Sequence, residues 1–275
     1  MKREEKLTTK VYTKNVLKEW KRLVKNPYHR LEFETTLHFL KKYLPKKALI
    51  LDAGGGPGRY TIELAKRGYD VTLLDFVPAN LQFALKKIRK AKVQKRIKGV
   101  VEGSITNLSM FKDNTFDAVI CLGGPLSHVH PESEREKAIS ELIRVTKKNA
   151  PIFVSVMAKF VTLMRGPGNY AHEIKMTKHF KKFAFEGDDY HFWKGQAFCH
   201  FFVLDEFKKL FDNKKVKVLE IVGLEGISSP DQKGTNKLYK DKKSWKNWME
   251  VHYKLCTHPT VVDTSQHMMI IVRKC

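Results

Sequence analysis

The stretch from residue 49 to residue 60, which reads LILDAGGGPGRY, constrains the fold more than any other part of the chain. Its apolar start predicts a buried strand, and its glycines predict a sharp turn into a helix that begins near Arg59. A side chain at Gly54, Gly56 or Gly58 would hold a ligand away from the main chain. The stretch therefore predicts a strand, a ligand-binding turn and a helix in succession.

A second strand is expected at residues 69–75, and it ends on Asp75. A carboxylate at this position can accept both hydroxyls of a ribose, as the corresponding acid does in dinucleotide-binding folds. The ligand of the glycine turn is therefore expected to be an adenosine derivative.

The spacing of the glycines narrows the choice of ligand. A dinucleotide pattern G-x-G-x-x-G would need glycine at Arg59 or at Thr61, and a phosphate-binding loop would need Gly-Lys-Ser/Thr, which is absent. The chain instead reads D-x-G-x-G-x-G from Asp52 onward. Together with the acid at Asp75, this pattern resembles motif I of the class I S-adenosylmethionine-dependent methyltransferases. A glycine-rich turn without a ligand and a pyridine-nucleotide site are the alternatives.

The resemblance implies that S-adenosylmethionine is the cofactor, and it assigns roles to single residues. Asp52 would face the amino-acid end of the cofactor, and Asp75 would hold the ribose. Ser104 stands where the family usually has an acid that reaches the adenine amino group, and its hydroxyl could accept the same hydrogen bond. The implied cofactor-binding residues are Asp52, Gly54, Gly56, Gly58, Asp75, Ser104, Ile105 and Leu122.

The rest of the chain fits a doubly wound α/β fold. Apolar runs predict five further strands, and helical periodicity predicts the helices between them. We therefore expect a seven-stranded, mostly parallel sheet with N-terminal helices, a frayed start over the first ten residues, and two insertions on the substrate side. The expected parts are an N-terminal helical cap at 1–45, a cofactor-binding core at 46–158, a basic and aromatic insertion at 159–202, and the rest of the core at 203–275 with a second basic insertion at 228–265.

The chain is strongly basic, with 52 Lys and Arg residues against 29 Asp and Glu residues and a formal net charge of +23. An excess of this size favours a polyanionic partner, nucleic acid before an anionic membrane surface. The alternative is the lysine-rich surface of a thermophile, although such surfaces usually balance lysine with glutamate. We therefore expect RNA as the partner and no membrane. The sequence leaves the oligomeric state open, with a monomer favoured.

Both insertions interleave cations with aromatic rings, a pattern that suits unstacked bases and phosphates. The alternative is that most of the rings pack the insertions' own small cores. The break between the N-terminal helices, at Asn26-Pro27, places further polar side chains where they could cover the cofactor. The expected substrate-binding residues are Tyr28, Arg30, Lys178, Lys181, Lys182 and Trp193.

The loop after the fourth strand, residues 123–128, should face the reactive methyl group, because ligands of open α/β sheets lie at the carboxyl ends of the strands. Carbon-5 methylation of a pyrimidine needs a cysteine in this loop, but Cys121 lies within the strand, and no Lys-Asp-Lys-Glu set for ribose methylation can be placed. A nitrogen nucleophile remains, and the backbone carbonyls of the loop could accept its protons. The expected catalytic residues are Gly123, Gly124, Pro125, Ser127 and His128, with an ordinary loop histidine as the alternative for the last.

No apolar run approaches the roughly 18 residues of a membrane span, and the lysine-rich N-terminus lacks the apolar core of a secretory signal. The cysteines are scattered, which favours reduced thiols and a cytoplasmic location. No metal is expected. The alternative is a zinc site built from Cys199, His200, Cys256 and His258.

These patterns together predict a cytoplasmic class I methyltransferase that modifies structured RNA, ribosomal RNA before transfer RNA, at a base nitrogen with cytosine N4 favoured. One alternative is a small-molecule or protein methyltransferase with a basic, thermophilic surface. Another is a non-catalytic RNA-binding protein with the same fold.

Overall fold

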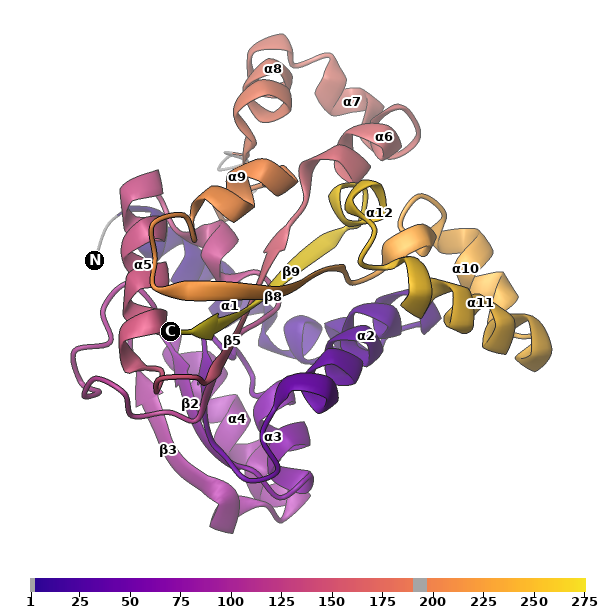
Figure 1. The fold of residues 1–275 in the computed structure, drawn as a ribbon. Helices are drawn as coiled ribbons and strands as arrows, with labels where there is room; N and C mark the ends of the chain where they lie inside the picture. The colour runs from indigo at the N-terminus through magenta and orange to yellow at the C-terminus, as the bar shows by residue number, and fades with distance from the viewer. Residues whose placement is uncertain (1–2, 190–196) are drawn as a thin grey trace.

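The computed structural model describes residues 3–189 and 197–275 and contains a seven-stranded sheet (Figure 1). The strands lie in the order β3-β2-β1-β4-β5-β9-β8. Neighbours from β3 to β5 are parallel, and β9 is antiparallel to both β5 and β8. This sheet confirms the predicted doubly wound, mostly parallel fold. Its strands are β1 (Leu49–Ala53), β2 (Asp70–Asp75), β3 (Ile97–Glu102), β4 (Ala118–Cys121), β5 (Pro151–Met157), β8 (Val216–Gly223) and β9 (His267–Lys274).

Helices cover both faces of the sheet, because consecutive residues of a buried strand point to opposite faces. In β1, Ile50 packs in one cluster with Phe39 and Leu64, and Leu51 packs in another cluster with Leu142. The helices on the Ile50 side are α2 (Pro27–Tyr43), α3 (Arg59–Lys66) and α4 (Pro78–Ala91). The helices on the Leu51 side are α5 (Glu132–Val145) and α9 (Leu204–Lys209).

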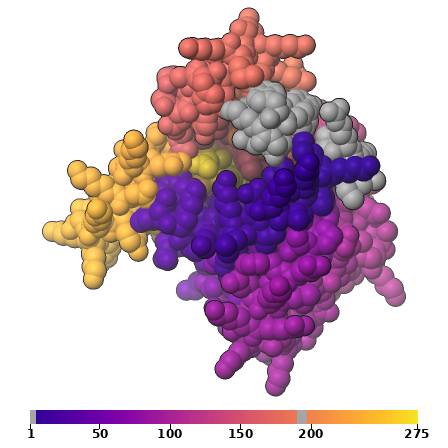
Figure 2. All heavy atoms as spheres, turned by 180° about the vertical axis from the view of Figure 1, so that it is seen from behind, coloured from indigo at the N-terminus to yellow at the C-terminus, as the bar shows by residue number. Residues whose placement is uncertain are grey.

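The N-terminal helix α1 (Arg3–Arg22) begins earlier than expected, because residues 3–10 are helical rather than frayed. Thr8 in this segment is buried, so the start of the helix packs against the protein. The helix break predicted at Asn26-Pro27 is present: the Asn26 side chain accepts a hydrogen bond from the backbone N–H of His29 and caps α2. Figure 2 shows the N-terminal helices, in indigo, crossing between the core and the first insertion.

The insertions are mostly helical and extend the molecule beyond the sheet. Figure 1 shows α6, α7 and α8 together past the end of β5, and α10 and α11 beside α2. No helix in the described ranges is long and apolar enough to cross a membrane. The first insertion contains α6 (Lys159–Asn169), α7 (Ala171–Ile174), α8 (Thr177–Glu186), β6 (Asp188–Asp189) and β7 (Cys199–His200). The second contains α10 (Gln232–Leu238), α11 (Lys242–Leu255) and α12 (Pro259–Asp263).

Candidate functional site

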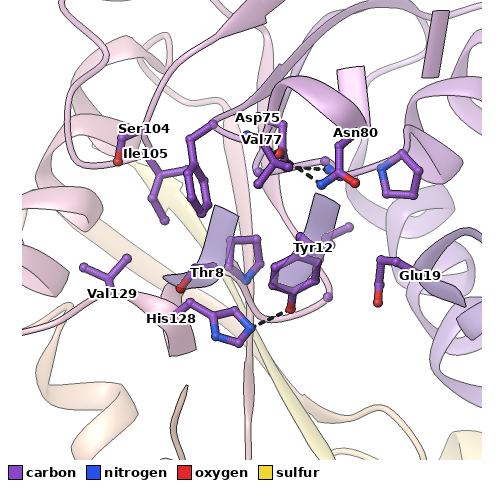
Figure 3. A pocket seen from close by; sticks show the side chains of 18 of the residues that line it. Thr8, Tyr12, Glu19, Asp75, Val77, Asn80, Ser104, Ile105, His128 and Val129 are labelled. Atoms are coloured by element: carbon purple, nitrogen blue, oxygen red, sulfur yellow. Dashed lines mark hydrogen bonds between the residues drawn. The ribbon is translucent and has the colours of Figure 1, made fainter. Parts of the chain in front are cut away.

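A pocket of about 320 Å³ lies at the carboxyl ends of β1 to β4, beneath α1 (Figure 3). The glycine turn, Asp75, Ser104 and Gly123 line it from the sheet, and Tyr12 and Glu19 line it from α1. Open parallel sheets bind their ligands at this edge. The structure therefore provides a ligand pocket where the sequence predicted one.

The glycine turn leaves its main chain open to this first pocket. Gly54 has φ +74°, and a Cβ added there would lie 2.7 Å from ring atoms of Pro125, so only glycine lets the turn pack on the loop after β4. Gly56 has φ +55°, and a Cβ there would meet nothing nearer than Nδ2 of Asn80 at 3.9 Å. Gly58, which precedes α3, does not line the pocket. Space for a ligand thus lies directly against the backbone at Gly56.

Asp75 is buried at the end of β2 and already holds three hydrogen bonds. Its Oδ2 accepts from the backbone N–H of Gly56 (2.8 Å), and its Oδ1 accepts from the N–H of Val77 (2.9 Å) and from Nδ2 of Asn80 (3.2 Å). Burial raises the pKa of this carboxyl above its usual value, and the hydrogen bonds oppose the shift. The Oδ1 atom of Asn80 is buried and has no hydrogen-bond partner in the described structure. A ribose diol would fit by donating one hydroxyl to Asn80 and the other to the remaining lone pair of Asp75.

Asp52 was expected to face the cofactor, but it lies beneath the glycine turn and does not line the pocket. It is almost fully buried, and its Oδ2 accepts a hydrogen bond from Oγ1 of Thr61 at 2.6 Å. Burial raises the pKa of its carboxyl to about 6. A Cβ at Gly55 would lie 2.6 Å from this carboxylate, so Asp52 supports the turn from below.

Ser104, Ile105 and Leu122, which were expected to hold the cofactor, all line the pocket. The hydroxyl of Ser104 lies 2.9 Å from Oγ1 of Thr106, so it already has one partner. Sequence reasoning missed Phe76 and Glu102, which line the same pocket. Phe76 offers a ring that a base could stack on, and Glu102 offers a carboxylate.

The loop after β4 includes the short 3-10 helix η2 (Pro125–His128) and divides into two groups of residues. Oγ of Ser127 accepts a hydrogen bond from the backbone N–H of Met157 (3.0 Å), and the carbonyl of Gly124 accepts from the N–H of Ser127 (3.0 Å). Neither Gly124 nor Ser127 lines the pocket, so both hold the loop against β5 instead of reaching a substrate. The carbonyl of Gly123 makes no hydrogen bond in the described structure. The expected catalytic residues that line the pocket are Gly123, Pro125 and His128.

His128 joins this loop to α1. Its Nδ1 donates to the backbone carbonyl of Phe198 (2.6 Å), which leaves Nε2 as the acceptor for the hydroxyl of Tyr12 at 2.7 Å (Figure 3). Burial lowers the pKa of His128, which favours this neutral form. His128 therefore has a structural role, because it binds α1 to the loop after β4, and it also lines the first pocket.

A second pocket, of about 660 Å³, adjoins the first. Tyr12, Glu19, Arg22 and Gly123 line both pockets, so the two meet beside this group. Side chains from α1, α6 and α8 build most of its walls. The phenylalanine and tyrosine residues that line the second pocket are Tyr12, Tyr170, Phe180, Phe183 and Phe201.

The expected substrate-binding residues fall mostly outside this second pocket. Tyr28 is fully buried, which is a correction: it has no free surface for RNA, and its hydroxyl donates to Oε1 of Gln266 at 2.8 Å. Arg30 is exposed and lines neither pocket. Trp193 lies outside the described residues. The predicted lysines lie on α8 outside both pockets, and they are Lys178, Lys181 and Lys182. Lys182 is half-buried, and its Nζ lies 3.7 Å from a carboxylate oxygen of Glu186.

Glu32, Glu225 and His267 form a buried cluster of metal-ligand type beside the second pocket, with their ligand atoms within 4.8 Å of one another. Nδ1 of His267 lies 2.7 Å from Glu225 and 3.7 Å from Glu32, while Arg22 donates to both oxygens of Glu32. Burial lowers the pKa of His267, but the two carboxylates raise it more, so the net shift is upward. The charges alternate along Arg22, Glu32, His267 and Glu225, which makes the cluster a network of ion pairs.

The alternative zinc site does not assemble in the described part of the chain. His200 instead bonds Asp188 (2.7 Å) and Glu206 (2.5 Å) through its two ring nitrogens. The four residues of that alternative site do not form a ligand cluster in the described ranges; they are Cys199, His200, Cys256 and His258.

Sequence reasoning missed the side chains that α1 contributes. Tyr12 and Glu19 are seven residues apart, a spacing that places them on one face of a helix. The signal was therefore present, but it does not say that this face covers the sheet. Asn80 follows Asp75 by five residues at the start of α4, and no pattern in the sequence distinguishes it.

The core of the chain is similar to known methyltransferases. Residues 50–149 match the model of a methyltransferase domain family. The glycine/sarcosine N-methyltransferase of Aphanothece halophytica is 28% identical over 137 residues, which cover 50% of this chain and 50% of that protein. Its namesake in Parasynechococcus marenigrum is 30% identical over 139 residues, which cover 50% of this chain and 48% of that protein. The chain thus spans about half the length of these curated relatives.

Solved structures share the fold over most of the chain. A methyltransferase described as SAM-dependent, from Methanosarcina mazei, matches with a TM-score of 0.58 at 20% identity and covers 86% of this chain and 96% of its own. The 1,6-didemethyltoxoflavin-N1-methyltransferase of Burkholderia thailandensis, solved with 1,6-didemethyltoxoflavin and S-adenosylhomocysteine, matches with a TM-score of 0.56 at 14% identity. It covers 98% of this chain and 88% of its own.

Proposed function

This chain belongs to the class I S-adenosylmethionine-dependent methyltransferases, and we propose that it methylates a small molecule held in the second pocket. S-adenosylmethionine would supply an activated methyl group from the first pocket, with its ribose at Asp75 and Asn80. The observation that carries the proposal is the junction of the pockets at Tyr12 and Gly123. A methyl donor and an acceptor can meet only where their pockets join.

Methyl transfer is an in-line displacement. A lone pair of the acceptor bonds the methyl carbon while the carbon–sulfur bond breaks and the sulfur keeps the electron pair. An amine acceptor also loses a proton, which passes to the solvent. The protein contributes mainly by positioning the acceptor and excluding water. Tyr12 confines the junction from α1, and the carbonyl of Gly123, which has no hydrogen-bond donor among the described residues, can accept an N–H of the acceptor.

Nitrogen is the favoured methyl acceptor. The curated relatives and the toxoflavin enzyme are N-methyltransferases by name. A cysteine-dependent carbon methylation is disfavoured here, because Cys121 is fully buried in β4 and burial raises the pKa of its thiol far above the usual value.

The test is formation of S-adenosylhomocysteine from S-adenosylmethionine with glycine, sarcosine and a panel of larger amines as acceptors. We expect turnover with at least one small amine, and we expect Asp75→Ala to abolish it at low cofactor concentration by weakening cofactor binding. Tight binding of the cofactor without turnover on any small acceptor would count against the proposal.

Methylation of a base nitrogen in structured RNA, with cytosine N4 preferred, is a second candidate that the net charge of +23 favours. Helix α8 supports it too, because Lys178 and Lys181 are exposed on the helix that also lines the second pocket through Phe180 and Phe183. Stacking of a flipped base on such rings is a common means of binding single-stranded RNA.

The salt dependence of RNA binding separates the two candidates. An RNA methyltransferase should lose RNA affinity linearly on a log–log salt plot, with a slope of about −0.7 per phosphate contacted on a single strand. Replacing Lys178, Lys181 and Lys182 with Ala should flatten this slope and leave cofactor affinity unchanged. A flat plot for the wild type favours the small-molecule acceptor.

A further inference from the structure

We propose that Arg165 anchors an anionic group of the methyl acceptor, so that the substrates of this enzyme carry a carboxylate or a phosphate. The proposal rests on the proposed function, because it treats the second pocket as the acceptor site. It adds the chemical class of the substrate and names the residue that selects it.

Arg165 lies on α6 and lines the second pocket. Its Nη1 donates to Oε1 of Gln266 (2.9 Å), and its Nη2 donates to the hydroxyl of Tyr28 (2.7 Å). The guanidinium also lies 5.4 Å from the centre of the Tyr28 ring. Because α2 and the residue before β9 hold the group from two sides, its orientation is set before any ligand binds.

The partners of Arg165 are neutral, and no carboxylate in the described ranges lies within ion-pair distance of it. Its Nε is buried and has no hydrogen-bond partner there. Arg22 and Arg144, by contrast, each bond two carboxylates. Arg165 is half-buried, and a partly desolvated cation without a counterion costs free energy, so an anion that enters the pocket gains the pairing that the described protein does not supply.

Other cations line the pocket besides Arg165, namely Lys18, Arg22 and Lys25, together with the carboxylates of Glu19, Glu173 and Asp189. Lys25 and His29 line the same pocket. Desolvation and the charges of Lys18 and Arg22 lower the pKa of Lys25, and desolvation together with the charge of Lys25 lowers the pKa of His29 to about 4. Lys18, Arg22 and Lys25 repel one another, and an anionic ligand would relieve that repulsion, whereas His29 is neutral near pH 7.

The rest of the pocket indicates what the anionic group is attached to. A pocket of about 660 Å³ is in the usual size range of small-molecule sites. Its aromatic side chains suit an apolar or ring-shaped body between the anionic end at Arg165 and the reacting end at Gly123. A planar guanidinium binds carboxylate and phosphate alike through paired hydrogen bonds, so both anions are candidates.

The test measures the binding of three probes of one shape to the full chain saturated with S-adenosylmethionine. Benzoate and phenyl phosphate carry the two anions, and benzamide is neutral. We expect the better anion to bind at least about tenfold more tightly than benzamide, and Arg165→Gln to remove most of that preference. Arg165→Lys should retain part of it, because it keeps the charge and loses the paired donors. Arg89→Gln, on an exposed part of α4, is the matched control and should change nothing.

Which anion binds more tightly decides between carboxylate and phosphate acceptors. Equal or undetectable binding of all three probes to the wild type would overturn the proposal, and so would a preference that survives Arg165→Gln. If Arg165→Gln unfolds in circular dichroism, the wild-type comparison and Arg165→Lys still decide. Calorimetry of S-adenosylmethionine on the same samples distinguishes failure of the proposed function from failure of the role of Arg165. A wild type that does not bind the cofactor argues against the proposed function. A wild type that binds the cofactor but shows no preference for an anion argues only against the role of Arg165.

Discussion

The hydroxyl of Tyr12 donates to Nε2 of His128 across 2.7 Å and thereby ties the N-terminal helix to the loop after β4. These residues are 116 positions apart in the chain, and both line the first pocket. A bound cofactor would lie beside this contact, so movement of the helix would change access to the pocket. The strength of the contact therefore affects both stability and cofactor exchange.

Tyr12→Phe tests this link. The substitution leaves the acceptor nitrogen of His128 without its donor, which should lower the free energy of unfolding by about 1 to 3 kcal/mol. It should also speed release of S-adenosylmethionine, since α1 is held less firmly. Urea titration and stopped-flow release measure the two effects. Tyr69→Phe is the control, because the Tyr69 hydroxyl makes no hydrogen bond in the described structure; equal behaviour of both variants would argue against the link.

Asp75 and Asn80 should divide the ribose between them. Asp75→Ala should weaken S-adenosylmethionine binding by about 1.5 to 3 kcal/mol, because it removes hydrogen bonds to a charged group. Asn80→Ala should weaken it by about 0.5 to 1.5 kcal/mol, as expected for a neutral hydrogen bond. Asp70→Ala, at the other end of β2, serves as the control in calorimetry. Unchanged affinity in Asn80→Ala would mean that its buried Oδ1 does not face the ribose.

Gly54 and Gly56 should respond differently to alanine. Gly54→Ala forces a methyl group to within 2.7 Å of Pro125, so its main effect should be a lower free energy of unfolding. Gly56→Ala places the methyl in open space beside the pocket and should mainly weaken cofactor binding, beyond a backbone strain of about 1 to 2 kcal/mol. Gly68→Ala, with φ +92° and no atom near its Cβ, measures the strain alone. The prediction is wrong if Gly56→Ala and Gly68→Ala bind the cofactor equally well.

The sheet and the first pocket could be predicted because their signals are local. The turn from β1 into α3 directly follows its strand, and Asp75 is the last residue of β2. Apolar runs predict every strand of the large sheet. The expectation for Asp52 missed its burial beneath Gly55, because the pattern of a motif does not show which side of the backbone a side chain takes. Ser127 was placed at the site for the same reason.

The second pocket could not be predicted, because distant segments build it. Tyr12, Gly123, Arg165 and His267 come from α1, the loop after β4, α6 and β9, and no local pattern connects them. The strong net charge led to a prediction of substrate binding by exposed lysines. In the sequence alone, nothing distinguishes Arg165 among the 52 Lys and Arg residues. Partial burial and the absence of an acidic partner among the described residues distinguish Arg165, and both are properties of the folded chain.

The buried network around His267 should make stability depend on pH. The carboxylates of Glu32 and Glu225 raise the folded-state pKa of His267 above its ordinary value near 6.5, against the opposing effects of burial and of the charge on Arg22. A raised pKa means that the stabilisation is fully present below the unfolded-state pKa and is lost as pH rises through the folded-state pKa.

The difference in unfolding free energy between the wild type and His267→Gln should therefore shrink as pH rises from about 6 through the raised pKa. His29 and His252 have folded-state pKa values lowered to about 4, so they act in the opposite sense and weaken the fold as pH falls below 6.5. The contribution of His252 cancels in the difference between the two proteins, whereas that of His29 becomes smaller in the variant, because the charge of His267 helps to lower the pKa of His29. Urea titrations of both proteins across this pH range measure the effect, and a difference that stays constant with pH would show that His267 is not protonated in the folded protein.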